Sequence, residues 1–360
     1  MTEKYESPLS SRYASEYMLH LFSAQKRIET WRRLWVSLAK AEMELGLPIT
    51  AQQVEELQQH ITDIDFDCAA QREKEVRHDV MAHVYTYGKA APSAAGIIHL
   101  GATSCYVTDN ADIVLYRDGL RYLRGELLKV IRNLSEFADT YKATPTLGYT
   151  HYQPAQLVTV GKRATLWMQD LLADLEELDF VIDNMKFLGC RGTTGTEASF
   201  VELFGGDTAK IDEMNRKISA DFGFDRCFSV CGQTYPRKLD SRILNALSAI
   251  AQSCYRMAND IRLLQLPCPV SYDRRHERPH DSLGAVAGAD AGRLRQPPHL
   301  HARGLPLRRC HFAAGSEHYK RPSCQRKNCG KDRPGVSALH RHGKPDDGGG
   351  QTGWQPAGAA

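Results

Sequence analysis

The sequence lacks features that would place it in several common functional classes. No stretch approaches the roughly 18 consecutive apolar residues of a membrane span, and the first ten residues are polar, so we expect neither a secretory leader nor membrane association. A net charge of +3 is too small to indicate nucleic-acid binding. The ten cysteines do not show zinc-site spacing, since Cys227 and Cys231 have no second pair. We therefore expect free thiols, no bound metal and a cytoplasmic location.

Isoleucine is absent from residues 266–360, although this segment holds 10 of the 16 prolines and 13 of the 28 glycines. Charge also changes there: residues 1–265 carry 30 Lys and Arg against 35 Asp and Glu, whereas residues 266–360 carry 16 against 8. This composition predicts an irregular or disordered tail, and the abrupt change near Gln265 suggests a shifted reading frame. Metal binding around His318, Cys324 and Cys329 is the alternative reading of the tail.

Strand patterns are almost absent before the tail, and apolar residues recur three and four apart. This spacing predicts a helix over 20–45 and a short surface helix over 51–60. Asp109 or Asn110 is expected to cap a long helix that continues to Phe137, about 45 Å for about 30 residues. Two further long helices are predicted, from Pro154 to Met185 and from Arg237 to Leu264. Such lengths are typical of an all-α long-helix bundle.

At 360 residues the chain exceeds a usual single domain. We expect an N-terminal helical domain over 1–104 and part of a central long-helix bundle over 105–265. Residues 266–360 are expected to form the separate Pro-, Gly-, Arg- and His-rich tail.

His151 stands in a polar stretch just before Pro154. Proline is favoured at the first position of a helix, so His151 is expected on the loop that enters one. Histidine can exchange a proton near neutral pH, which makes His151 a candidate acid or base. A purely structural histidine is the alternative.

Six short blocks combine hydroxyl, amide, histidine and arginine side chains with glycine. They are Ser11–Tyr13, Arg77–His83, Ile98–Cys105, Thr150–Gln156, Gly192–Thr196 and Gly232–Tyr235. In this order and over residues 1–265, they resemble the adenylosuccinate lyase family of the fumarase/aspartase superfamily. The Arg-His-Asp and Gly-Gln-Thr-Tyr blocks favour this family over argininosuccinate lyase, fumarase and aspartase.

The resemblance implies a truncated fumarase/aspartase-type helical bundle. It also implies β-elimination of fumarate from adenylosuccinate, giving AMP, and from the succinylated aminoimidazole carboxamide ribotide of purine synthesis. The substrate is a small nucleotide, and no metal or organic cofactor is needed. Family members are homotetramers in which each site is assembled from three subunits.

Carried over by motif, the resemblance assigns roles to ten residues. His151 matches the general acid, and Arg12 and Tyr13 match phosphate-holding residues. Substrate-contact positions are matched by Arg77, His78, Asp79, Thr103, Ser104, Thr150 and Gln233, with the hydroxyls of Thr103 and Ser104 facing the succinyl carboxylates.

Simpler readings exist for several of these residues. Arg12 could be a surface arginine, and His78 could bond only the backbone at Asp79. Thr193, Thr194 and Thr196 could be turn residues, while Gly101 and Gly195 are expected to serve backbone geometry.

The sequence departs from the family pattern after Leu264. The family's Gly-Ser-Ser-x-Met-Pro-x-Lys-x-Asn-Pro loop, whose serine is the base, does not occur in it. Two alternatives to an active lyase follow: a catalytically inactive, truncated or frame-shifted copy, or a non-catalytic oligomerisation partner.

Overall fold

The computed structural model of the chain describes residues 7–151 and 153–265. Within them the elements are, in chain order, η1 (Leu9–Tyr13), α1 (Glu16–Leu21), α2 (Ala24–Glu44), α3 (Ala51–Gln59), α4 (Phe66–Val76), α5 (Asp79–Ala90), η2 (Pro92–Ala94), α6 (Ser104–Thr140), β1 (Pro145–Thr150), β2 (Gln153–Thr159), α7 (Val160–Asp183), α8 (Ala198–Leu203), α9 (Thr208–Asp221) and α10 (Lys238–Leu264). The predicted helical fold is confirmed. The predicted irregular tail lies outside the described residues.

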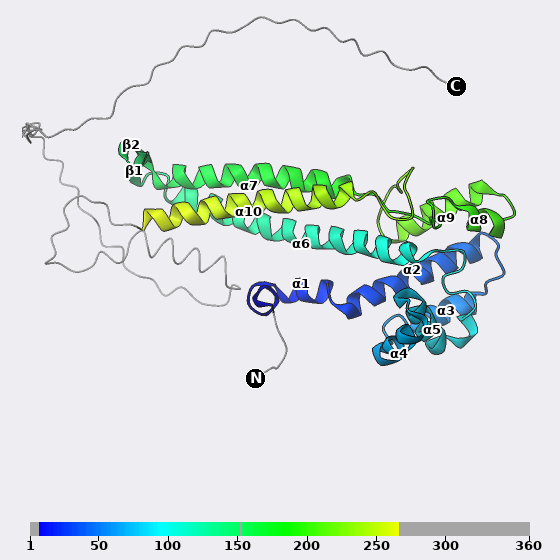
Figure 1. Ribbon diagram of the computed structural model, residues 1–360. Coiled ribbons are helices and arrows are strands. Elements are labelled where there is room, and N and C mark those ends of the chain that lie inside the picture. The colour runs from blue at the N-terminus through cyan, green and yellow to red at the C-terminus, as the bar shows by residue number, and fades with distance from the viewer. Residues whose placement is uncertain (1–6, 152, 266–360) are drawn as a thin grey trace, which may run out of the picture. The chain divides into compact units, whose positions relative to one another are not determined.

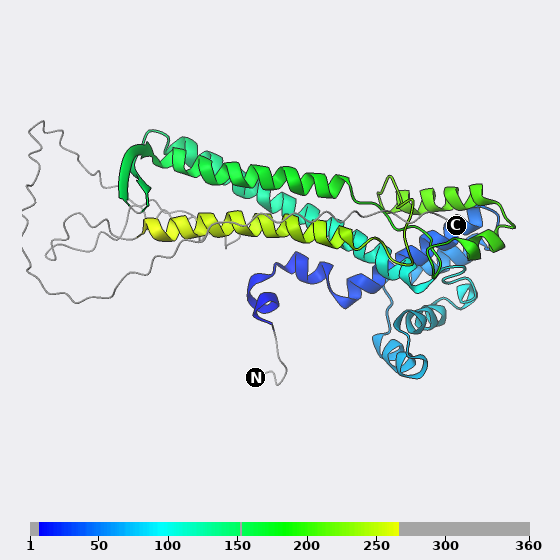
Figure 2. The same ribbon diagram turned by 45° about the horizontal axis from the view of Figure 1, so that its top comes forward.

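Three long helices, α6, α7 and α10, run side by side (Figures 1 and 2). Helix α7 packs against both of the others. Near the hairpin end, Ala138 of α6, Ala164 and Trp167 of α7 and Met257 of α10 form a small apolar cluster. Apolar stripes at helical spacing are therefore buried between neighbouring helices, as the sequence predicts.

The main core lies where α2 meets α3, α9 and α6, and Tyr87 of α5 packs against Trp35 of α2. Its largest members include Trp31, Trp35 and Tyr87, all almost inaccessible to solvent. Helix α2 begins at the N-cap Ser23, whose hydroxyl accepts from the backbone N–H of Lys26 at 3.1 Å. This cap separates α2 from α1, so the helix predicted over 20–45 is two helices.

The expected domain boundary at residue 104 falls at the first residue of α6. The main core cluster nevertheless extends from Ile28 to Ala246 and includes both sides of this position. The division into 1–104 and 105–265 therefore stays a prediction.

Two local predictions are wrong. Pro154 does not open α7 but lies in β2, which pairs antiparallel with β1. The helix starts six residues later at Val160, behind the N-cap Thr159. Asp109 and Asn110 do not cap α6 but lie buried in its second turn, because both side chains bond residues beyond residue 185.

No helix in the described part of the chain is long and apolar enough to cross a membrane.

Candidate functional site

Two motif blocks meet a third at the N-terminus of α6. Gln233 donates through Nε2 to Oγ1 of the N-cap residue Thr103 at 3.0 Å. The next hydroxyl, Ser104 Oγ, lies 3.0 Å from His78 Nε2. The structure thus brings His78, Thr103, Ser104 and Gln233 together, although 155 positions separate the first of them from the last. We call these four residues the α6 N-terminal cluster.

His78 occupies the N-cap of α5, where its Nδ1 accepts from the backbone N–H of Met81 at 3.4 Å. The bond to the backbone of Asp79 that was considered for this ring does not form; instead Asp79 bonds its own neighbour, Val80. Nδ1 also lies 3.6 Å from Asp79 Oδ1. In the tautomer in which Nδ1 accepts, the proton lies on Nε2 and is donated to Ser104 Oγ. The Ser104 hydroxyl proton then remains available to a ligand.

The N-terminus of α6 favours a negatively charged ligand. The Thr103 side chain makes no capping bond to its own helix. The backbone N–H of Tyr106 bonds the carbonyl of Thr103, so the N–H groups of Ser104 and Cys105 are those that this helix start leaves for a ligand. A helix N-terminus carries a partial positive charge and binds carboxylates and phosphates. Together with the two hydroxyls, this end of α6 can hold a carboxylate.

A buried carboxylate fixes the loop that carries Gln233. Asp109 Oδ2 accepts from the backbone N–H of Tyr235 at 3.0 Å and lies 3.3 Å from Arg237 Nη2. The Tyr235 hydroxyl in turn donates to Asp240 at 2.6 Å. Asp109, which sequence reasoning placed at a helix cap, therefore holds the 232–237 loop against α6.

The glycine-rich loop at 192–196 packs directly on this segment. At Gly195 (φ 81°) a Cβ would lie 2.2 Å from the carbonyl oxygen of Cys231. The backbone N–H of Gly192 donates to the carbonyl of Thr196 at 2.6 Å, which closes a turn. Gly195 thus serves backbone geometry, as predicted. Gly101 does so too, since its φ is 66° and a Cβ would approach Leu203 to 2.7 Å.

Sequence reasoning missed His99, which belongs to the same region. His99 lies in the turn before α6, its Nδ1 accepts from Trp35 Nε1 at 2.9 Å, and it interacts electrostatically with His78. Burial, with a smaller effect of His78, lowers the pKa of His99 to about 4. The sequence indicates His99 only through its position in the Ile98–Cys105 block, in which the predicted site residues are the hydroxyl residues Thr103 and Ser104.

Three of the six motif blocks contain a residue with an unusual backbone conformation. Among the described residues other than glycine, only Arg77, His99 and His151 have positive φ, at 52°, 66° and 52°. Positive φ is uncommon for residues other than glycine, and such residues concentrate at functional sites. Each of the three lies in a block that the sequence had singled out.

The predicted phosphate-holding residues precede a helix that contacts α6 far from its N-terminus. Arg12 and Tyr13 are exposed in η1. Helix α1 follows directly, and its Tyr17 stacks on Tyr122 of α6 with ring centroids 4.4 Å apart. Tyr122 is 18 residues beyond Ser104, or about 27 Å along the helix axis.

His151 and Thr150 lie at the far end. Both are exposed in the β1–β2 hairpin, where Thr150 pairs with Gln153. The hairpin follows the C-terminus of α6 (Figure 1), and this helix of 37 residues is about 55 Å long. Within a single chain, His151 and the α6 N-terminal cluster therefore lie at opposite ends of α6 and cannot contact the same small ligand.

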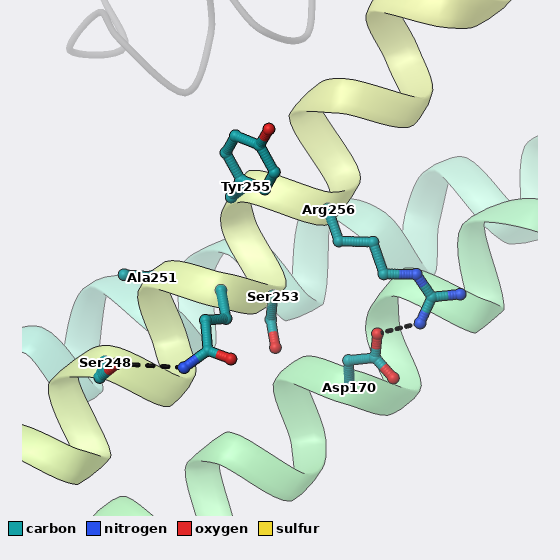
Figure 3. Close-up of a pocket in the computed structure, with 7 residues that line it drawn as sticks. Asp170, Ser248, Ala251, Ser253, Tyr255 and Arg256 are labelled. Atoms are coloured by element: carbon teal, nitrogen blue, oxygen red, sulfur yellow. Dashed lines mark hydrogen bonds and ion pairs between the residues drawn. The ribbon is translucent and has the colours of Figure 1, made fainter.

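A groove of about 580 Å³ opens between α7 and α10 (Figure 3). Asp170 and Arg256 form an ion pair of 2.5 Å across it, and its other lining residues come from α10: Ser248, Ala251, Gln252, Ser253 and Tyr255. None of the predicted site residues line this groove. It contains no histidine or cysteine, so the candidate chemistry lies elsewhere. Across residues 7–151 and 153–265, no group of acidic, histidine and cysteine side chains is arranged to hold a metal ion.

The family model described as "Lyase" matches residues 14–271, and the chain belongs to this lyase family. The match ends close to the composition change at Gln265. The chain is 53% identical over 263 residues to the adenylosuccinate lyase of Schizosaccharomyces pombe, covering 72% of this chain and 55% of that one. It is 50% identical over 265 residues to the adenylosuccinate lyase of Saccharomyces cerevisiae, with coverages of 73% and 55%. The chain thus spans about half the length of these curated relatives.

Two solved structures share the fold. A fumarate lyase from Mesorhizobium aligns with a TM-score of 0.63 at 23% identity, covering 71% of this chain and 58% of that one. A 3-carboxy-cis,cis-muconate lactonizing enzyme from Pseudomonas putida aligns with a TM-score of 0.64 at 20% identity, covering 79% and 65%. These identities support the helical fold alone.

Proposed function

We propose that the chain carries part of an adenylosuccinate lyase site, which eliminates fumarate from adenylosuccinate to leave AMP. The same cleavage applies to the succinylated aminoimidazole carboxamide ribotide. The observation that carries the proposal is the meeting of His78, Thr103, Ser104 and Gln233 at an open helix N-terminus. Relatives that bear this name are 41–53% identical over the same region.

The family resemblance gives each group a role, and the chemistry of the side chains suits it. The hydroxyls of Thr103 and Ser104 and the N-terminus of α6 bind a succinyl carboxylate, which stabilises negative charge developing on the neighbouring carbon. Arg77, His78, Asp79 and Gln233 contact the rest of the substrate, and Arg12 and Tyr13 hold its phosphate.

His151, beside Thr150, acts as the general acid that protonates the leaving nitrogen. No cofactor takes part in these steps.

The proposed site needs more than one chain. An acid must lie within hydrogen-bonding distance of the atom it protonates, whereas His151 and Ser104 lie at opposite ends of α6. We therefore propose that the groups at the two ends of α6 come from different subunits when they form one site. The family resemblance adds that this assembly is a homotetramer in the cytoplasm. Several large apolar side chains on the long helices are exposed and are available to pack against other subunits. They are Leu128, Leu166, Leu172, Phe180, Leu244 and Tyr255.

A catalytically inactive copy is the second candidate. The block that supplies the family's serine base does not occur in this sequence. The chain would then retain binding groups and the acid without the base, or act only as a partner in assemblies with intact subunits.

Fumarate release from adenylosuccinate by the purified 360-residue chain tests the proposal directly. If the chain is active, His151→Ala lowers turnover by at least about 10²-fold. His60→Ala is the control, since the His60 ring pairs with Asp63 and with no other described side chain, and it should leave turnover unchanged. Equal activity of all three proteins would contradict the general-acid assignment.

Absence of release from the native chain would favour the inactive copy. Capture of the intact Saccharomyces cerevisiae relative by the tagged chain, without release by the chain alone, would support the partner role.

A further inference from the structure

The Trp35–His99 hydrogen bond decides which ring nitrogen of His99, close to the α6 N-terminal cluster, can carry a proton. Trp35 lies in α2 and is 1% exposed, with its ring edge-on to His99 at a centroid distance of 5.9 Å. Its Nε1 lies 2.9 Å from His99 Nδ1. An indole nitrogen can only donate a hydrogen bond. His99 Nδ1 must therefore accept, and it cannot carry a proton.

We propose that Trp35 is a positioning residue that holds His99 as a neutral imidazole with its proton on Nε2. The state of a histidine ring is set by the bond that its other nitrogen makes. Here that bond comes from the core, and the positive φ of His99 turns the side chain to meet it. The fixed proton leaves Nε2 as a permanent donor.

The surroundings of the ring favour the same state. Among the described residues, the charged or titratable group that acts on His99 is His78, whose effect also lowers the pKa of His99, because two imidazolium rings so close together would repel each other. No described carboxylate faces the ring to stabilise an imidazolium, and burial lowers the pKa of His99. His99 is half-buried and not sealed in the core, and no described residue accepts a bond from its Nε2.

A neutral Nε2–H donor beside the open end of α6 suits an anionic oxygen of a ligand. It binds a carboxylate or phosphate oxygen without gaining or losing a proton across the neutral pH range. Binding of an anionic ligand by His99 Nε2–H rests on the proposed function. The neutral tautomer of His99 does not depend on that function. The two claims are therefore tested by different measurements.

Nitrogen NMR of the full chain labelled with ¹⁵N-histidine tests the inference. Long-range spectra distinguish protonated from unprotonated ring nitrogens, and a His99→Gln variant identifies the His99 signals. We expect an unprotonated Nδ1 and a protonated Nε2 at all values between about pH 5 and pH 8, where an ordinary histidine titrates. A proton on Nδ1, or titration of His99 within this range, would overturn the proposal.

Trp35→Phe keeps an aromatic ring and removes the donor. In this variant we expect His99 to populate both neutral tautomers or to titrate in the ordinary range. Trp31→Phe is the matched control: Trp31 lies on the same helix, is equally buried, and its Nε1 has no described partner. It carries a similar packing cost and should leave the His99 signals as in the native chain.

An unchanged His99 in folded Trp35→Phe would also overturn the proposal. Backbone circular dichroism establishes that each variant is folded. Should Trp35→Phe not fold, the tautomer and titration of His99 in the native chain still decide the outcome. The fumarate assay is separate, so its failure would leave the ring state standing.

Discussion

Glu42 is a buried acid that the proposed chemistry does not use. It lies in α2 with no exposed surface, and neither carboxylate oxygen has a hydrogen-bond partner among the described residues. Burial raises its pKa to about 8. Glu42 acts electrostatically on Tyr106 and Cys190, and burial raises the pKa of both of these groups as well. The side chain is therefore protonated in the folded protein at neutral pH.

A raised pKa makes folding depend on pH with a definite sign. The folded state holds the Glu42 proton until about pH 8, whereas the unfolded state releases it near the ordinary value of about 4.3. The contribution of Glu42 to the free energy of unfolding should therefore fall as pH rises between these values, by about 1.4 kcal/mol per pH unit. Urea unfolding of the native chain and of Glu42→Gln, measured from about pH 5 to pH 8, should show that the native free energy of unfolding falls by this slope relative to that of Glu42→Gln. The lowered pKa of His99 adds a slope of opposite sign, but it acts equally in both proteins.

Glu44 offers the control for this prediction. It lies two residues away and bonds Lys217 at 2.8 Å, which lowers its pKa. Any contribution from Glu44 is therefore lost as pH falls, and Glu44→Gln should keep the falling slope that Glu42 produces. The same slope in Glu42→Gln as in the native chain would contradict a protonated Glu42.

The candidate site was predictable from sequence only where residue type indicated chemistry. Thr103, Ser104 and His78 were selected by motif and do meet. Asp109 and Asn110 were assigned to a helix cap because their side chains favour caps. Their tertiary partners decided otherwise: Asn110, fully buried, accepts from the backbone N–H of Leu188 at 2.9 Å and donates to the carbonyl of Gly189 at 3.1 Å. Contacts across 79 positions cannot be read from local preference.

At the level of elements, the three long helices were predicted because each maintains a helical apolar period for many turns. The β1–β2 hairpin was not, because its strands are short and largely exposed and so lack an alternating apolar pattern. Pro154 was consistent with either a helix start or an edge strand. Pairing with β1 stabilises residues 153–159 as strand β2 rather than as the start of a helix. The local sequence does not indicate this pairing.

Two helical glycines give a matched pair for testing the bundle. At Gly161, near the start of α7, a Cβ would lie 2.3 Å from the carbonyl oxygen of Ala138 and 2.7 Å from the Cα of Lys142. At Gly125, inside α6, nothing lies within 4 Å. Gly161→Ala should thus lower the free energy of unfolding by about 1–3 kcal/mol, as overpacking does.

Gly125→Ala should instead raise the free energy of unfolding by about 0.5–1 kcal/mol, because alanine restricts the unfolded chain and favours helix. Urea titrations of both variants beside the native chain provide the comparison. A stabilising Gly161→Ala would mean that the α6 and α7 backbones do not approach as closely as described.

At the scale of the molecule, the length of α6 separates groups of predicted site residues. The α6 N-terminal cluster lies at its start, Tyr17, which follows Arg12 and Tyr13 in the chain, stacks on Tyr122 at its middle, and His151 follows its end. Long helices hold such separations rigidly, so no side-chain movement within one chain can join the groups. This separation supports the proposed sharing of a site between chains, which would bring unlike ends of two copies together.

Mixing two inactive variants tests sharing of the site. His151→Ala lacks the acid and Ser104→Ala lacks a carboxylate donor, so each alone should release little fumarate. If a site takes His151 from one chain and Ser104 from another, random mixed assemblies regain both groups in about a quarter of their sites. Co-refolded variants should then recover up to about a quarter of native turnover, provided that the native chain is active.

Mixtures of His151→Ala with Thr150→Ala are the control, since these neighbours come from the same chain and no site regains both. Recovery in neither mixture, from an active native chain that assembles, would show that each chain completes its own site.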